Sequence, residues 1–194
     1  MKEGIGDRFN QAARAIQASS EHLSPRIADA VAIILACYRN GGGVLVFGNG
    51  GSAADAQHIA GELVGRFLME RRALRAHALT TDTSILTALG NDYGFSQVFA
   101  RQVEAMGRKG DVAVALSTSG NSENVLAALA KAREMGMKTI ALTGLGGGRC
   151  AELVDVLLDV PADLPCPRIQ EVHQVIYHVL CEFVERALAE GAAE

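Results

Sequence analysis

The 194-residue sequence contains no tryptophan, and aromatic residues make up only 5% of it. It also lacks a basic run, and its net charge of −4 does not indicate a nucleic-acid partner. The apolar runs at 44–47 and 112–116 are far too short to span a bilayer, and the charged N-terminus lacks the apolar block of a signal peptide. These absences predict a cytoplasmic protein that binds neither nucleic acid nor membrane.

The sequence also lacks CxxC spacing, which argues against a zinc–thiolate site. Its cysteines lie within or beside apolar stretches, a placement typical of reduced thiols packed as small hydrophobic side chains. They are Cys37, Cys150, Cys166 and Cys181.

The length and a hydrophobic content of 49% predict one well-buried domain over 1–194. An apolar stripe predicts a helix over 5–18, and Ser24-Pro25 is typical of the N-cap and first position of a second helix. The expected parts are an N-terminal helical pair at 1–40, an α/β core at 43–160 and a long C-terminal helix at 168–190.

Strand-like apolar runs alternate with helical patterns through the core. The runs lie at 44–47, 74–79, 111–116, 137–144 and 155–160, and helical patterns cover 80–90, 95–106, 122–135 and 149–153. This alternation predicts right-handed crossovers and a doubly wound, flavodoxin-like sheet of five parallel strands. Ligands bind such sheets where the strand order reverses, so we expect the turns after the first and third strands to face one crevice.

The first of these turns is GNGGS, at Gly48–Ser52. Missing side chains let backbone N–H groups approach a ligand, and the start of the following helix favours an anion. The spacing fits neither a dinucleotide fingerprint nor a Walker loop. Taken alone, the turn is compatible with ligand contact and with simple tight-turn geometry.

The second turn has hydroxyl groups at four of six positions around Gly120, and these belong to Ser117, Thr118, Ser119 and Ser122. At a helix start they could hold a phosphate by uncharged hydrogen bonds, whereas an ordinary capping turn needs only one hydroxyl. The count favours a phosphate site.

His58 and Glu62 are spaced i, i+4 on one predicted helix face, with Arg66 one step further. They form either a solvated pair or an acid/base pair. On the C-terminal helix Gln170, Gln174 and His178 repeat every four residues, while His173 fits a core histidine bonded to the backbone. Composition cannot separate these alternatives for His178.

Four separated segments resemble the phosphoheptose isomerase family, whose members are single-domain sugar isomerase (SIS) proteins. They are GNGGSAADAQHIAGELVGR, Asn91-Asp92, STSGNS and RIQEVHQVIYHVLCE, in the family's order and over nearly the whole chain. The resemblance implies a homotetramer that converts sedoheptulose 7-phosphate to D-glycero-D-manno-heptose 7-phosphate, the first step toward the heptose of lipopolysaccharide core or related glycans.

The resemblance also implies residue roles. Glu62 and His178 correspond to the proton-transfer pair. Zinc, one ion per subunit, would be bound by His58, Glu62, Gln170 and His178. Ser117, Thr118, Ser119 and Ser122 would hold the phosphate, and Asn49, Gly50, Gly51, Ser52, Arg66, Asn91, Asp92 and Gln170 would contact substrate.

Some SIS relatives are non-catalytic adaptors that bind the replication initiator, and others sense sugar phosphates in regulators. An adaptor has no chemical reason to keep the Glu62/His178 pair, which this chain retains. The sequence therefore favours the enzyme over the adaptor or sensor.

Overall fold

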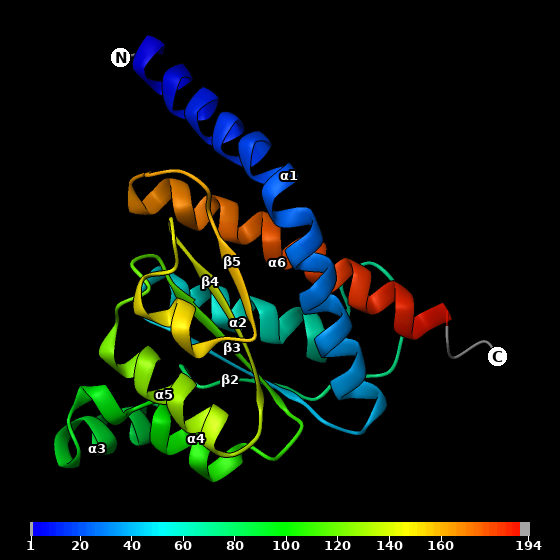
Figure 1. Ribbon diagram of the computed structural model, residues 1–194, viewed down its shortest axis with the longest axis vertical. Helices are drawn as coiled ribbons and strands as arrows, with labels where there is room; N and C mark the ends of the chain where they lie inside the picture. Colours follow the sequence, from blue (N-terminus) through cyan, green and yellow to red (C-terminus); the bar gives the residue numbers. More distant parts are fainter. Residues whose placement is uncertain (1, 191–194) are drawn as a thin grey trace.

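Five parallel strands form one sheet in the order β2-β1-β3-β4-β5 (Figure 1). The computed structural model describes residues 2–190. The strands are β1 (Val44–Gly48), β2 (Ala76–Ala78), β3 (Val112–Ser117), β4 (Lys138–Thr143) and β5 (Val156–Asp159). This is the flavodoxin-like order, so the predicted doubly wound α/β fold is confirmed.

Alternate residues of β1 pack into two separate cores. Val44 and Val46 face one core, and Leu45 and Phe47 face the other. The first core is covered by α1 (Lys2–Arg39), α2 (Gly51–Val64) and α6 (Cys166–Glu190). The second is covered by α3 (Thr83–Asp92), α4 (Ala100–Met106), α5 (Glu123–Glu134) and the 3₁₀ turns η1 (Phe95–Gln97) and η2 (Gly148–Leu153).

The expected pair of N-terminal helices is wrong, because α1 is a single helix that continues through Pro25 (Figure 1). Ser24 does not cap a second helix, and its hydroxyl donates to the Ser20 carbonyl at 2.5 Å. His22 and Arg26, on either side of the proline, both bind Asp159 at the end of β5. These contacts and packing on α6 hold the helix together where proline removes one backbone hydrogen bond.

Two further helix boundaries differ from the sequence prediction. The α3 helix runs through Gly90, so Asn91 and Asp92 form its last turn instead of following it. The helix expected over 95–106 is divided into η1 and α4. Phe95, the first residue of the expected helix, is 62% exposed and begins the 3₁₀ turn that follows Gly94, whose φ is +82°.

Three cysteines are buried as expected, and burial raises the pKa of Cys37 and Cys150 to about 11 and that of Cys181 to about 12. They stay protonated near neutral pH. Cys166 is exposed at the first position of α6, so its predicted packing is wrong. Within residues 2–190, no helix combines the length and apolar character needed to cross a membrane.

Candidate active site

The turns that follow β1 and β3 face one another, as predicted, because these strands are neighbours at the switch point. The side-chain amides of Asn49 and Asn124 join the turns through two reciprocal hydrogen bonds, with N···O distances of 2.9 and 2.8 Å. Asn124 lies in the first turn of α5 and is 4% exposed. Because both ends of the Asn49 amide are used, this side chain ties the turn after β1 to the start of α5.

The hydroxyl-rich turn is folded tightly beneath the start of α5. Gly120 has a φ of +65°, and a Cβ there would lie 2.0 Å from the Gly147 carbonyl oxygen. Ser122 occupies the N-cap position, yet its hydroxyl makes no capping bond and lies 3.3 Å from the Ser117 hydroxyl. The capping interpretation therefore does not explain Ser122, and both hydroxyls are placed at a helix N-terminus, where an anion is favoured.

The other two hydroxyls of this turn, on Thr118 and Ser119, also make hydrogen bonds. Ser119 Oγ accepts from the Asn121 N–H at 3.2 Å, and Thr118 Oγ1 lies 3.5 Å from the Cys166 thiol. No cation is among the four predicted phosphate residues. The turn can therefore offer a phosphate hydrogen bonds and the helix dipole.

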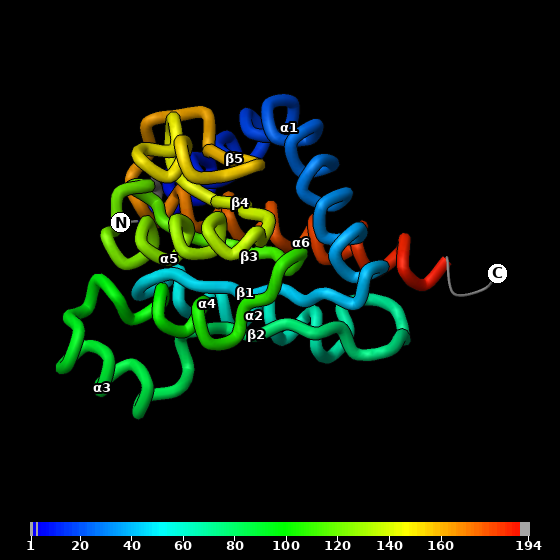
Figure 2. Tube along the Cα trace, turned by 60° about the horizontal axis from the view of Figure 1, so that its bottom comes forward, coloured from blue at the N-terminus to red at the C-terminus, as the bar shows by residue number. Residues whose placement is uncertain are grey.

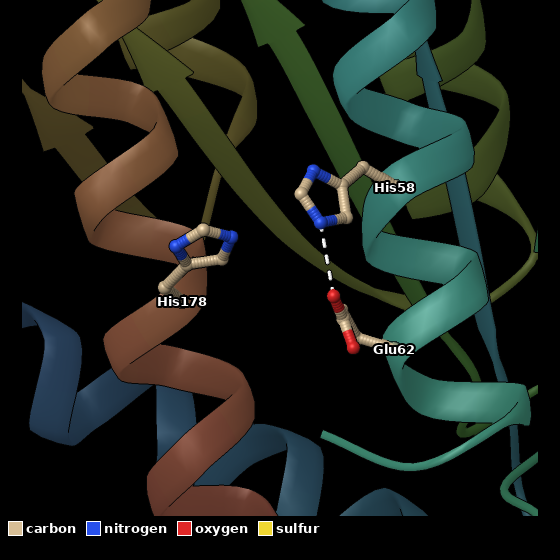
Figure 3. A group of neighbouring side chains, drawn as sticks. All are labelled: His58, Glu62 and His178. Carbon is tan, nitrogen blue, oxygen red and sulfur yellow. Dashed lines mark hydrogen bonds and ion pairs between the residues drawn. The ribbon is translucent and has the colours of Figure 1, made fainter. Parts of the chain in front are cut away.

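His58 and Glu62 from α2 meet His178 from α6, as Figure 3 shows. One potential ligand atom from each of these three residues lies within 4.8 Å of the other two. His58 Nε2 is 2.9 Å from Glu62 Oε1, and the rings of His58 and His178 are 5.1 Å apart at their centroids. Burial and the nearby His58 lower the pKa of His178, while Glu62 acts in the opposite direction. Near pH 7 His178 is therefore a neutral imidazole, suited to donate an N–H or to bind a metal.

Tyr177 and Asp55 hold the far side of the His58 ring. The Tyr177 hydroxyl lies 3.0 Å from His58 Nδ1 and 3.4 Å from Asp55 Oδ1. A tyrosine has one proton, and a carboxylate can only accept, so we assign that proton to Asp55 and let His58 Nδ1–H donate to Tyr177. With His58 Nδ1 as the donor, the Nε2 lone pair faces Glu62 Oε1 at 2.9 Å, where a shared proton or a metal ion can lie between them.

Gln170 is on α6 but reaches the glycine-rich turn. A Cβ on Gly51 would lie 2.4 Å from Gln170 Nε2, so only glycine leaves room for this amide. His173, by contrast, is fully buried, and its Nε2–H donates to the Thr143 carbonyl at 3.1 Å. Burial lowers the pKa of His173 to about 4, which confirms the prediction of a neutral core histidine.

The SIS-domain family model matches residues 8–144. The chain is 53% identical over 188 residues to a phosphoheptose isomerase of Geotalea daltonii, with 97% of each chain covered. It is also 53% identical over 190 residues to one of Aquifex aeolicus, covering 98% of this chain and 99% of the relative. The chain belongs to the phosphoheptose isomerase family of SIS proteins. It is an isomerase.

A solved structure supports this assignment. Phosphoheptose isomerase GmhA from Neisseria gonorrhoeae superimposes on the chain with a TM-score of 0.90 at 47% identity, covering 95% of this chain and 98% of that one. The enzyme from Francisella tularensis gives a TM-score of 0.91 at 43% identity, covering 95% and 97%.

Not every residue that the phosphoheptose isomerase resemblance implies is brought to the crevice. Asn91 and Asp92 are exposed at the end of α3, which stands apart from the sheet (Figure 2). The Asn91 side-chain amide donates a hydrogen bond to the Asp92 carboxylate at 2.8 Å. Arg66 is exposed just after α2, with its guanidinium 3.8 Å from Glu70. Within the described chain, neither the Asn91-Asp92 pair nor Arg66 makes a hydrogen bond or ion pair with the His58–Glu62–His178 cluster.

Sequence reasoning missed Asn124, Tyr177 and Asp55. Asn124 stands two residues after the hydroxyl-rich turn, and this position at a helix start could have marked it as a candidate site residue. Asp55 stands one helical turn before His58, close enough to have been considered with it. Nothing in the spacing of Tyr177 distinguishes its hydroxyl from the ring of an ordinary core residue.

Proposed function

We propose that the chain interconverts sedoheptulose 7-phosphate and D-glycero-D-manno-heptose 7-phosphate, as a first step toward the heptose of lipopolysaccharide core or related glycans. The observation that carries the proposal is the convergence of Glu62 and His178 from two helices, beside a crevice with a hydroxyl-lined turn. Relatives with 53% identity named phosphoheptose isomerase support the choice of substrate.

Aldose–ketose isomerisation needs a base, an acid and stabilisation of an enediol. We assign Glu62 as the base that removes a proton from C1 of the open ketose. The C–H electron pair forms the C1–C2 double bond, and the C2 oxygen receives a proton from His178. Glu62 then returns its proton to C2 while His178 takes the proton from the C1 hydroxyl, which leaves the aldose.

The phosphate is held by Ser117, Thr118, Ser119 and Ser122 in this scheme. Its binding energy holds C1 and C2 against the acid/base pair, so losing the anchor reduces turnover as well as affinity. Asn49, Gly50, Gly51 and Ser52 line the sugar from the β1 side. Arg66, Asn91, Asp92 and Gln170 remain substrate contacts by the family resemblance.

We also propose a zinc site, one ion per subunit, built from His58, Glu62, His178 and the Gln170 amide. Two imidazoles and a carboxylate are a donor set that zinc accepts, and one ligand atom from each residue lies within 4.8 Å of the other two. When bound, zinc would polarise the substrate carbonyl. A metal-bound Glu62 is a poorer base, so metal binding and proton transfer compete for this carboxylate.

A homotetramer is the proposed assembly. The first half of α1 exposes Phe9 (75%) and Ile5 (54%), and an apolar groove runs between α1 and α6. Exposed apolar surfaces of this kind favour association. Light scattering after size exclusion tests the assembly, and a monomer at micromolar concentration would refute it.

Glu62→Gln tests the enzymatic proposal. This nearly isosteric change removes the base, and we expect turnover of sedoheptulose 7-phosphate to fall at least ~100-fold. Glu134→Gln, which changes an exposed glutamate on α5, is the matched control and keeps full activity. Near-normal turnover by Glu62→Gln would overturn the assignment, and an inactive wild-type chain that captures a replication initiator would favour the adaptor.

Metal dependence is a separate test. Wild-type protein is treated with a chelator, assayed, and assayed again after zinc is restored. We expect activity to fall and then to return. Activity that is indifferent to both treatments contradicts the zinc site but leaves the Glu62 result intact.

A further inference from the structure

A buried carboxylate on α6 holds the loop that leaves α2. Glu185 has 2% of its side chain exposed and accepts hydrogen bonds from the backbone N–H groups of Phe67, Leu68 and Met69, at 2.8, 2.6 and 2.8 Å. Although burial acts in the opposite direction, these three donors and Arg71 lower the pKa of Glu185. The carboxylate is therefore charged, and it fixes three consecutive backbone amides.

Arg71 extends the same network to the end of α2. Its side chain is 5% exposed, and Nε lies 3.2 Å from Glu185 Oε1. The terminal guanidinium nitrogens donate to the carbonyl oxygens of Glu62, Leu63 and Gly65, at 2.6, 3.0 and 3.0 Å. Carbonyls in the last turn of a helix lack intrahelical partners, and a cation is favoured there. Arg71 thus caps α2 at the turn that carries Glu62 and binds the carbonyl of that residue.

The loop held by Glu185 also places an aromatic ring against His178. The Phe67 ring lies 5.5 Å from the His178 ring between centroids, with an interplanar angle of 35°. His178 and Glu185 are seven residues apart on α6, so they project from similar faces of that helix. Glu185 therefore holds the backbone of the residue that packs on His178.

We propose that Glu185 and Arg71 are positioning residues that set Glu62 and His178 at their working separation. Arg71 ties the end of α2 to Glu185 on α6, and Glu185 seats Phe67 against the imidazole. The inference rests on the proposed acid/base roles of Glu62 and His178. It adds that the geometry of the pair depends on a buried ion pair that does not touch substrate.

A matched buried carboxylate lies at the amino-terminal end of the central strand β3. Asp111 is 1% exposed, accepts from the N–H groups of Gly43 and Arg108 at 2.9 and 3.0 Å, and pairs with Arg75. It precedes β3, and these three partners lie outside α2, α6 and residues 67–69. Asp111→Asn and Glu185→Gln therefore remove similar buried charges, but only Glu185 binds the Phe67 loop and Arg71.

We expect both variants to lower the thermal unfolding temperature, because each leaves a buried arginine or backbone donors without their charged partner. Only Glu185→Gln should reduce kcat, by about 10- to 100-fold, with a KM change below about threefold, because small misplacements of catalytic groups have effects of this size. Equal kcat losses in the two variants would indicate general destabilisation and overturn the proposal.

A spectroscopic readout follows His178 directly. The chain has five histidines, so imidazole NMR signals from labelled histidine can be resolved, and His178→Gln assigns the relevant signal. We expect the His178 signal to shift in Glu185→Gln and in Phe67→Leu, which removes the packed ring but leaves the ion pair. It should not move in Asp111→Asn.

Two further variants keep the proposal testable if Glu185→Gln does not fold. Arg71→Lys retains the charge, but its single nitrogen cannot reach both the helix carbonyls and Glu185. We therefore expect a kcat loss of about 10-fold, with Phe67→Leu giving a similar loss. Wild-type kcat and an unmoved His178 signal in both folded variants would overturn this inference. Full activity of Glu62→Gln would instead overturn the proposed function, so the two failures are distinguishable.

Discussion

The units β1–α2 and β3–α5 share one backbone plan and differ in chemistry. Each is a buried strand, a tight glycine-containing turn and a helix, and Asn49 and Asn124 join them. The α2 unit presents His58 and Glu62, which need partners on α6, whereas the β3 turn presents hydroxyls on a helix start. The fold thus supplies two equivalent positions that carry different side chains. We propose that the first is the reactive unit and the second is the anchor unit, which holds the phosphate.

The largest effect should come from the reactive unit and its partner on α6. We expect His178→Gln to lower kcat by about 10²- to 10⁴-fold, because it removes the proposed acid, while KM changes little. Steady-state kinetics with sedoheptulose 7-phosphate measures both constants. A rise in KM at unchanged kcat would make His178 a binding residue and erase the contrast between the two units.

The anchor unit should respond differently. Replacing Ser122 by alanine removes one hydroxyl, and we expect kcat/KM to fall about 10- to 100-fold, since a hydrogen bond to a charged group contributes about 1.5–3 kcal/mol. Competitive inhibition by inorganic phosphate should weaken in this variant and not in His178→Gln. Unchanged phosphate inhibition would place the phosphate elsewhere.

A smaller effect is expected from Tyr177, whose hydroxyl contacts the His58 ring. Tyr177→Phe removes the hydroxyl between His58 and Asp55, and we expect zinc affinity to fall about 10-fold or more, as for other residues that orient metal ligands. Competition with a chromophoric chelator measures this. Tyr93→Phe, an exposed tyrosine, is the control, and equal affinities in both variants would refute the role of Tyr177.

The smallest effect on catalysis should come from Asp159, at the end of β5. Burial opposes ionisation, but His22, the Gly146 N–H and Arg26 together lower the pKa of this carboxyl. Its stabilisation is present above the unfolded pKa of about 3.9 and is lost as pH falls through the lower folded pKa.

We therefore expect Asp159→Asn to lower the free energy of unfolding at pH 7 by about 1 kcal/mol and to flatten its acid dependence, with kcat unchanged. Urea unfolding at pH 3 and pH 7 tests this. A large kcat loss would show that α1 and β5 influence the site.

Local pattern was sufficient for the sheet and insufficient for α1. Each strand could be read because its apolar run ends at a glycine, a proline or a hydroxyl-rich turn, and β1 and β3 occupy the expected switch point. Ser24-Pro25 suggested a helix start, but His22 and Arg26 hold the helix across the proline through Asp159, more than 130 residues away. Such a contact has no local signature.

The sequence by itself determined the alternation of strands and helices, the hydroxyl-rich turn and the shared face of His58 and Glu62, because these depend on spacing within one element. Only the tertiary structure decided that His178 meets that face and that Glu185 and Arg71 tie the two helices together. The reason is physical: α2 and α6 meet because both bury apolar faces on the same side of the sheet, and that packing depends on the whole core.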